Sequence, residues 1–257
     1  MIEGFLTALV FLAVASYYDI FNRRVIPDWV SYSFIVVALI FSIIYYGTDF
    51  ARIGIALLVF VVGYLIYRMG YLGGADVFFL SGIMLTLPLS ISGMPTILIV
   101  LLASTIIMAI YLEVSFLSKN RVIKPRIEDI ATSVIWIIGY AIVSYMLYSL
   151  DMPLLALVAV VVGICSALFA LIKRDLTKSL ITWVKPDEII EEDILATDEM
   201  DKKIVERYNL ERLLTKEMIA RIKRARIRIV PIYGKLPPYI PFLMLGVIVA
   251  LAIYYYI

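Results

Sequence analysis

Long apolar runs recur along the chain, and this feature most constrains what it can fold into. A helix needs about 17–25 apolar residues to cross the hydrocarbon of a bilayer. Eight segments close to that length cover residues 3–20, 29–46, 51–69, 76–92, 95–117, 131–149, 153–172 and 238–257. The sequence therefore predicts an all-α, polytopic membrane protein of about eight transmembrane helices.

Composition agrees with this class and excludes several kinds of site. The chain is 63% hydrophobic and 17% charged, whereas a soluble domain carries about 25% charged residues. It contains no histidine, which excludes histidine bases and histidine metal ligands. Its single cysteine, Cys165, excludes a disulfide within the chain and a multi-cysteine zinc site. We expect no metal and no cofactor.

The distribution of Lys and Arg predicts the orientation in the membrane. With eight spans, 22 of the 23 basic residues fall in loops on one side, and only Arg52 falls on the other. Basic loops face the cytoplasm. The segments expected there are 20–28, 69–75, 118–130 and 173–237. We therefore expect a multi-pass protein of the cytoplasmic membrane with both termini outside.

Two aspartates stand at the ends of apolar segments. Asp19 ends the first segment, and Asp76 opens the fourth. An ionisable residue within the bilayer costs roughly 2.5–3.5 kcal/mol on insertion scales and is a functional hypothesis by default. The predicted topology puts both aspartates at similar depth, near the cytoplasmic face. They can therefore meet.

A pair of neighbouring carboxyl groups suits peptide hydrolysis. The two share one proton, so the ionised member can activate a water while the protonated member donates to the peptide carbonyl. The small residues Gly73, Gly74 and Ala75 before Asp76 would let the backbone approach a substrate strand closely. Taken singly, each aspartate has a plainer explanation. Asp76 could cap its helix, and Asp19 could pair with Arg23 one turn later.

Two motifs carry a resemblance to a known family. One is Asp19 followed by a short basic loop and Val25-Ile26-Pro27-Asp28; the other is Gly73-Gly74-Ala75-Asp76. Both resemble the type IV prepilin peptidases, and most of all the archaeal preflagellin and prepilin-like signal peptidases, which are GxGD membrane aspartyl proteases. Ala75 departs from the second glycine of that motif. The resemblance covers residues 1–92 and implies that Asp19 and Asp76 are catalytic, with Gly73, Gly74 and Ala75 supporting their loop.

The resemblance also implies an activity. The chain is expected to be an aspartyl endopeptidase that removes a short basic leader from archaellin- and pilin-like precursors at the cytoplasmic face. Its partners would be those precursors and the lipid bilayer. The bacterial members carry a cysteine-rich zinc-binding insertion and also methylate the new N-terminus, so a single cysteine favours a peptidase-only enzyme. Two alternatives stay open: a presenilin-like protease that cuts within transmembrane segments, and a proton-coupled transporter, since paired membrane carboxylates also relay protons.

A charged insertion over residues 173–237 separates the membrane domain, residues 1–172, from the last helix, residues 238–257. Its first part, residues 187–201, holds eight acids and no base. Its basic part is expected to be helical, with apolar residues at helical spacing, and then a strand over 223–228. The helical set is Leu210, Leu213, Leu214, Met218 and Ile222. The insertion is either a solvated cap whose bases lie on anionic lipid or an acidic holder for the basic leader. Nucleic-acid binding is not expected, because no aromatic platform interleaves the bases.

Overall fold

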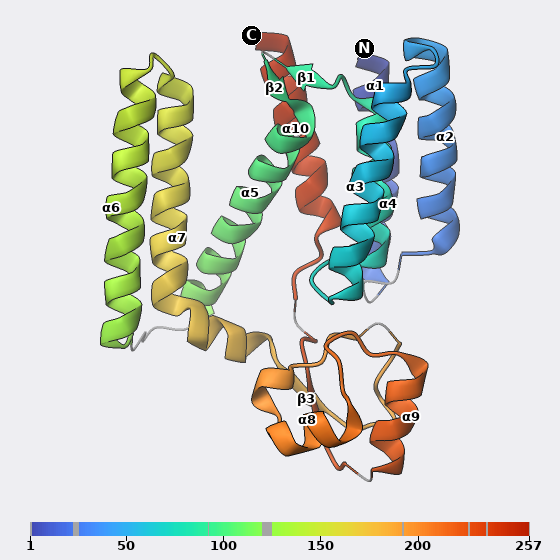
Figure 1. The fold of residues 1–257 in the computed structure, drawn as a ribbon, viewed down its shortest axis with the longest axis vertical. Helices are drawn as coiled ribbons and strands as arrows, with labels where there is room; N and C mark the ends of the chain where they lie inside the picture. Colours follow the sequence, from blue (N-terminus) through green and yellow to red (C-terminus); the bar gives the residue numbers. More distant parts are fainter. Residues whose placement is uncertain are drawn as a thin grey trace. The chain divides into compact units, whose positions relative to one another are not determined.

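The computed structural model describes residues 2–22, 26–91, 93–119, 125–191, 193–225, 227–234 and 236–256. Figure 1 shows the order of its helices and short strands. The chain forms two compact units. One comprises Met1–Ser104 together with Ile181–Ile257, and the other comprises Thr105–Leu180. Both aspartates singled out by the sequence lie in the first unit.

A helix lies at each of the eight predicted segments, so the prediction of a mostly helical membrane fold is confirmed. Among the described residues, six helices are long and apolar enough to cross a membrane. They are α1 (Ile2–Phe21), α2 (Asp28–Tyr46), α3 (Phe50–Arg68), α5 (Thr96–Lys119), α6 (Ile127–Ser149) and α7 (Pro153–Leu180). Two further apolar helices are shorter: α4 (Gly74–Thr86) has 13 residues and α10 (Ile240–Tyr256) has 17.

The prediction of a span reaching residue 92 is wrong at its C-terminal end, because α4 ends at Thr86. Pro88 follows two residues later, and a proline disfavours helical backbone in the residue before it. Leu87 is accordingly extended, with ψ 158°. The chain then forms a small antiparallel hairpin of β1 (Ser90–Ile91) and β2 (Met94–Pro95).

Helix α4 is the central element of the first unit. It contacts α1, α2 and α3, and almost every residue from Asp76 to Thr86 is buried. Such burial fits a helix that is apolar on all sides. Gly82 lets α2 approach closely, since a Cβ there would lie 2.3 Å from the Phe34 ring. Phe34 in turn stacks on Phe79, with ring centroids 5.1 Å apart. Asp76 thus belongs to the most enclosed helix of this core.

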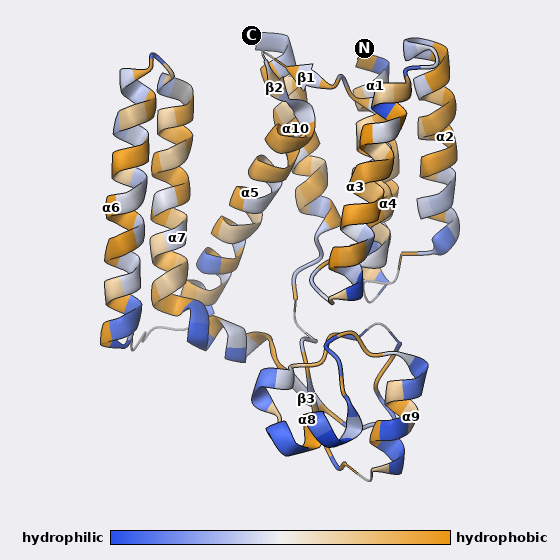
Figure 2. Cartoon of the chain, in the orientation of Figure 1, coloured by the Kyte–Doolittle hydropathy of each residue, from blue (hydrophilic) through white to orange (hydrophobic). Residues whose placement is uncertain are grey.

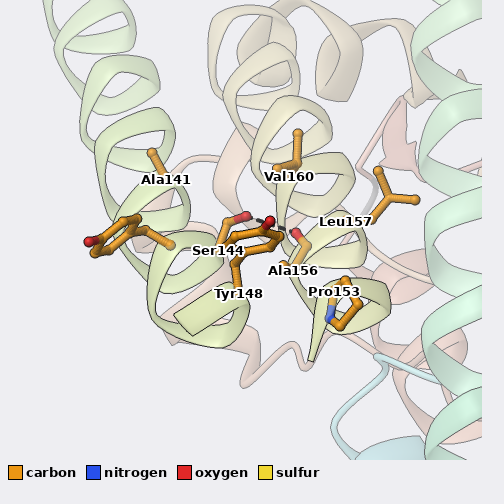
Figure 3. Close-up of a pocket in the computed structure, with 8 residues that line it drawn as sticks. Ala141, Ser144, Tyr148, Pro153, Ala156, Leu157 and Val160 are labelled. Atoms are coloured by element: carbon orange, nitrogen blue, oxygen red, sulfur yellow. Dashed lines mark hydrogen bonds between the residues drawn. The ribbon is translucent and has the colours of Figure 1, made fainter. Parts of the chain in front are cut away.

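The second unit contains the long hairpin of α6 and α7, which lie side by side in Figure 1. Gly163 packs against Tyr140, and the Ser144 hydroxyl donates to the Ala156 carbonyl at 3.0 Å. Figure 3 shows a pocket between the two helices, with mostly apolar walls. Its lining residues are Ala141, Ser144, Tyr145, Tyr148, Pro153, Ala156, Leu157 and Val160. In the described part of α6, only Ser133 is buried; the apolar remainder suits contact with lipid.

Residues 181–239, called the polar module below, form a small folded body within the first unit. Strands β3 (Thr182–Val184) and β4 (Val230–Ile232) pair antiparallel. They are joined by the short 3-10 helix η1 (Thr197–Glu199) and by helices α8 (Lys202–Tyr208) and α9 (Lys216–Arg224). Figure 2 shows hydrophilic colouring on α8 and α9 against the apolar long helices. The module nevertheless has its own hydrophobic core, which contains Ile189, Leu195, Leu210, Leu214, Met218, Ile222, Val230 and Ile232.

The predicted helix over the basic part of the insertion is interrupted. Helix α8 ends at Tyr208, and Asn209 adopts the left-handed conformation with φ 46°. Helix α9 begins after Thr215, whose hydroxyl accepts the Met218 N–H. It continues through Arg224, so the strand expected over 223–228 is wrong, and the observed strand is β4. Four of the five predicted apolar positions are buried, and Leu213 is partly buried.

Candidate active site

Asp76 is the third residue of α4, and its carboxylate is fixed by the start of that helix. The side chain is buried, with 9% of its surface exposed. Its Oδ2 accepts the backbone N–H of Gly73 at 3.0 Å. Asp76 is therefore not the N-cap residue, which is Gly73; it lies at N3 and caps the helix start by accepting the Gly73 amide. The same bond orients the carboxylate, and the helix N-terminus favours its negative charge.

The three small residues before Asp76 differ in role. Gly74 and Ala75 already belong to the first turn of α4, while Gly73 precedes it in ordinary extended backbone with φ −74° and ψ 148°. No described residue of this motif needs positive φ, so Ala75 fits without strain. Gly73 is constrained by space instead. A Cβ at this position would lie only 2.8 Å from Oδ2 of Asp76.

Asp19 lies near the C-terminal end of α1, on the face that α1 buries. This face also carries Leu12, Ala15 and Ser16. Only 7% of the Asp19 surface is exposed. Its Oδ2 accepts the N–H of Ile240, the first residue of α10, at 3.1 Å. The proposed ion pair with Arg23 lies outside the described residues.

The structure brings the two aspartates together in one core. Helix α1 packs against both α4 and α10, so the buried side chains of Asp19 and Asp76 belong to helices that contact one another. Each carboxylate is held by one backbone amide at a helix start, one from Gly73 and one from Ile240. Two buried like charges are costly to ionise together. Such a pair readily shares a proton, and it can therefore act as acid and base at once.

The contribution of α10 was missed by sequence reasoning. The first amides of a helix have no partner within it. In α10, Pro241 has no N–H, and those of Phe242 and Leu243 donate to Tyr239. Ile240 thus has an amide to offer, and Asp19 takes it. The prolines at positions 237, 238 and 241 mark this helix start in the sequence, but they do not indicate which acid its amide will meet.

Comparison with known proteins adds a family to this geometry. Residues 6–112 match the type IV leader peptidase family. This stretch is a type IV leader peptidase domain. The family consists of aspartic leader peptidases, which are hydrolases acting on prepilin-like substrates with leader peptides. No curated protein and no solved structure matches the chain. The protein is therefore a multi-pass membrane protein with a leader peptidase domain, as its two motifs indicated.

The leader peptidase domain contains both aspartates and helices α1 to α4. It does not contain the polar module or α10, although α10 supplies the amide that Asp19 accepts. The site as folded therefore extends beyond the matched residues.

Other acids of the chain have simpler roles. Asp28 lies in the first turn of α2, and Asp129 accepts the Arg126 N–H at the start of α6. Glu113 is a further buried acid, 3% exposed, whose Oε1 has no hydrogen-bond partner in the described part of the chain. It lies in the second unit. No group of three potential metal ligands occurs among the residues that the structure describes.

Proposed function

We propose that Asp19 and Asp76 are the catalytic pair of the leader peptidase domain. The observation that supports this proposal is the burial of two carboxylates on contacting helices, each accepting a backbone amide at a helix start. Perturbed, partnered acids of this kind are typical of functional sites. Their residue types and motif positions also fit the aspartic chemistry of the family.

The chemistry follows from the shared proton. The ionised member of the pair takes a proton from a water molecule, which attacks the carbonyl carbon of the scissile peptide bond. The protonated member donates to the carbonyl oxygen. The tetrahedral intermediate then collapses, and the leaving amine takes up a proton. Both carboxyl groups act as one unit, so the roles of acid and base belong to the pair.

We further propose that the site faces the cytoplasm. The Lys and Arg distribution supports this side. The polar module, which holds many of those bases, packs against the turn after α3 that leads to Asp76. A precursor with a short basic leader and a long apolar helix suits such a site, because the helix stays in lipid while the leader reaches the cytosol. Archaellin- and pilin-like precursors have this form.

The acidic segment is the remaining candidate for holding the leader. Part of it is already engaged within the polar module: Asp187 pairs with Lys223 at 3.0 Å, and Glu191 with Lys216 at 3.2 Å. Asp198 and Glu199 differ: both are exposed, and after burial their negative charges are what raises the pKa of Tyr233. Tyr233 packs under Arg212 beside the turn after α3. We propose that any capture of a basic leader uses Asp198 and Glu199.

The decisive experiment is cleavage of an archaellin precursor by the purified protein in lipid bilayers, with the product N-terminus sequenced. A single cut between the basic leader and the apolar helix is expected. A cut within the apolar helix would favour the presenilin-like alternative. The Asp19→Asn and Asp76→Asn variants should be inactive, while Asp151→Asn, at an exposed turn with φ 57°, serves as the matched control. Full activity of either aspartate variant would refute the proposed pair.

A further inference from the structure

The polar module reaches the turn before Asp76 through one side chain, Arg212. Its guanidinium carbon lies 4.5 Å from the ring centroid of Tyr71 and 5.4 Å from that of Tyr233. Both distances are within the range of cation–π attraction. Tyr71 belongs to the turn after α3, and Tyr233 belongs to the module. Arg212 thus bridges the module and the turn.

The turn itself is built to fit Arg212. Helix α3 ends with the Gly70 N–H bonded to Tyr67 O at 2.8 Å and the Tyr71 N–H bonded to Ile66 O at 3.2 Å. This pair of bonds is the Schellman motif, which requires the left-handed backbone that glycine adopts readily; φ of Gly70 is 73°. A Cβ at Gly70 would also lie 3.2 Å from Cγ of Arg212. The glycine therefore allows the turn to close directly onto the arginine.

On the other side, Arg212 is fixed to the core of the polar module. Its carbonyl accepts the N–H of Leu195 at 2.7 Å, and Leu195 is fully buried. The Tyr233 N–H donates to Ile194 O at 2.8 Å, so both partners are attached to the same segment. Nε of Arg212 is buried without a hydrogen-bond partner, and within the described residues no carboxylate pairs with this arginine. The two rings are its principal side-chain contacts.

The turn leads directly into the candidate site. Gly73, two residues after Tyr71, donates the N–H that orients Asp76. Any shift of Tyr71 therefore moves the donor of that hydrogen bond. Gly73 also has little space around it, because a Cβ at this position would lie only 2.8 Å from Oδ2 of Asp76.

We propose that Arg212 is a positioning residue for the reaction. It fixes the turn Gly70–Gly73 to the polar module and so keeps the Gly73 amide at hydrogen-bond distance from the Asp76 carboxylate. This inference rests on the proposed catalytic role of Asp76. It gives the polar module a function in catalysis that does not depend on binding the leader.

The test uses the full chain in lipid bilayers and a pair of variants on each side of the contact. Arg212→Ala and Tyr71→Leu remove the stacking, and each should lower kcat about tenfold, with KM within about twofold. Their combination should be no worse than either alone, because both break one contact. Tyr71→Phe keeps the ring and should cleave normally. Arg212→Lys keeps the charge without the planar group, so it should recover part of the loss.

The matched control is Arg221→Ala, which removes another arginine of the same module. Arg221 is half exposed and pairs with Glu217 at 3.8 Å on the surface of α9. This variant should leave kcat unchanged. A rise in KM at constant kcat for Arg212→Ala would overturn the proposal, since it would mark a contact with the leader. An unchanged kcat would overturn it as well.

A second measurement does not require activity. Hydrogen exchange of the amides in residues 70–76 should be faster in Arg212→Ala than in Arg221→Ala, while residues 53–66 of α3 exchange as in the unaltered protein. Equal exchange at 70–76 in the two variants would refute the clamp, as would faster exchange throughout the polar module and α3. Failure of the proposed function is seen separately, as absent cleavage by the unaltered protein or persisting cleavage by Asp19→Asn.

Discussion

Helix α4 has a buried charge at each end, and the surroundings of the two charges differ. At its C-terminal end, Arg52 donates to the carbonyls of Met84 and Leu87, lies 3.8 Å from Asp49 and stacks on Tyr46 at 3.6 Å. Every one of these partners favours a positive charge. At its N-terminal end, Asp76 faces a second acid of the same sign.

On the proposed function, this difference separates a charge that stabilises the fold from a pair of acids that takes part in a reaction. Arg52 satisfies the free carbonyls at the helix end, which are orphan acceptors in any helix, and its charge complements the dipole there. Asp19 and Asp76 each accept a helix-start amide, but placing the two acids on contacting helices satisfies no such need. A fold that holds like charges in its core tolerates a cost, and such cost is expected where a reaction uses the pair.

The largest effect on the cleavage rate is expected from replacing the two aspartates, Asp19 and Asp76. The Asp19→Asn and Asp76→Asn variants should each lower the cleavage rate by about 10³-fold or more, and the double variant should be no slower than the singles, because residues acting as a unit are not additive. Their thermal unfolding midpoints should equal or exceed that of the unaltered protein, since a like-charge contact is removed. Clearly lower unfolding midpoints would show that the two acids stabilise the fold as Arg52 does, and this result would contradict the comparison.

The opposite outcome is expected at the other end. Arg52→Met should lower the free energy of unfolding by about 2–4 kcal/mol, because buried carbonyls lose their donor. Cleavage per folded molecule should persist. Arg68→Met, an exposed position on the same helix α3, is the control and should change stability by less than about 0.5 kcal/mol. If Arg52→Met is as stable as Arg68→Met, the contacts around Arg52 contribute little.

Adding a single methyl group at Gly73 tests whether its amide positions the carboxylate of Asp76. Gly73→Ala places a Cβ 2.8 Å from Oδ2 of Asp76 and should lower kcat by about 10–100-fold, since small misplacements at a reacting group are costly. Gly74→Ala is the matched control. Its Cβ would lie 3.4 Å from the Tyr67 ring, an ordinary contact, so the rate should stay near normal. Equal rates for the two variants would show that the Gly73 amide does not position Asp76.

The smallest effect concerns the acids of the polar module. Reversing Asp198 and Glu199 to Lys should raise KM a few-fold for precursors with basic leaders, and the effect should fade in salt because exposed charges are screened beyond about 8–10 Å. Reversing Asp187 and Glu191, which already pair with module lysines, serves as the comparison. Normal cleavage by the Asp198 and Glu199 variant at low salt and limiting substrate would assign leader specificity to the region of the aspartates.

The pKa of Tyr233 offers a test of the same surface that requires no substrate. Burial raises the pKa of its phenol, the nearby charge of Arg212 lowers it, and Asp198 and Glu199 raise it. Replacing Arg212 by Ala should therefore raise this pKa further, and reversing the two acids should lower it. Ultraviolet absorbance titration of the variants against a Tyr233→Phe control measures both shifts. An unchanged titration would contradict the contacts at this position.

Local patterns were enough to predict the apolar helices and the two aspartates. Hydrophobic runs and helix-start acids are encoded within a few residues, so Asp76 was placed correctly at the start of its helix. The end of α4 was not predicted correctly. The apolar run continues past Pro88, so the predicted span was extended beyond the residue at which the proline ends the helix.

Contacts between distant segments could not be predicted. The bond from Ile240 to Asp19 joins residues 221 apart, and nothing near Ile240 indicates which acid it will meet. In the sequence, Arg212 is not distinguishable from the other basic residues of the charged insertion. Only the structure shows that it lies against the turn at Gly70. The prediction of one helix in the basic part of the polar module also failed. Its apolar residues at helical spacing belong to a loop and a helix that share one core.

The bond between Asp19 and α10 has a consequence for biosynthesis. Asp19 is translated 221 residues before its amide partner, Ile240. At about 5–20 residues per second, this interval lasts about 10–40 s. Until Ile240 is made, Asp19 lacks the hydrogen bond that joins it to α10. A nascent chain therefore gains the bond between Asp19 and α10 only after the polar module has been translated, so on the proposed function activity would wait for that step.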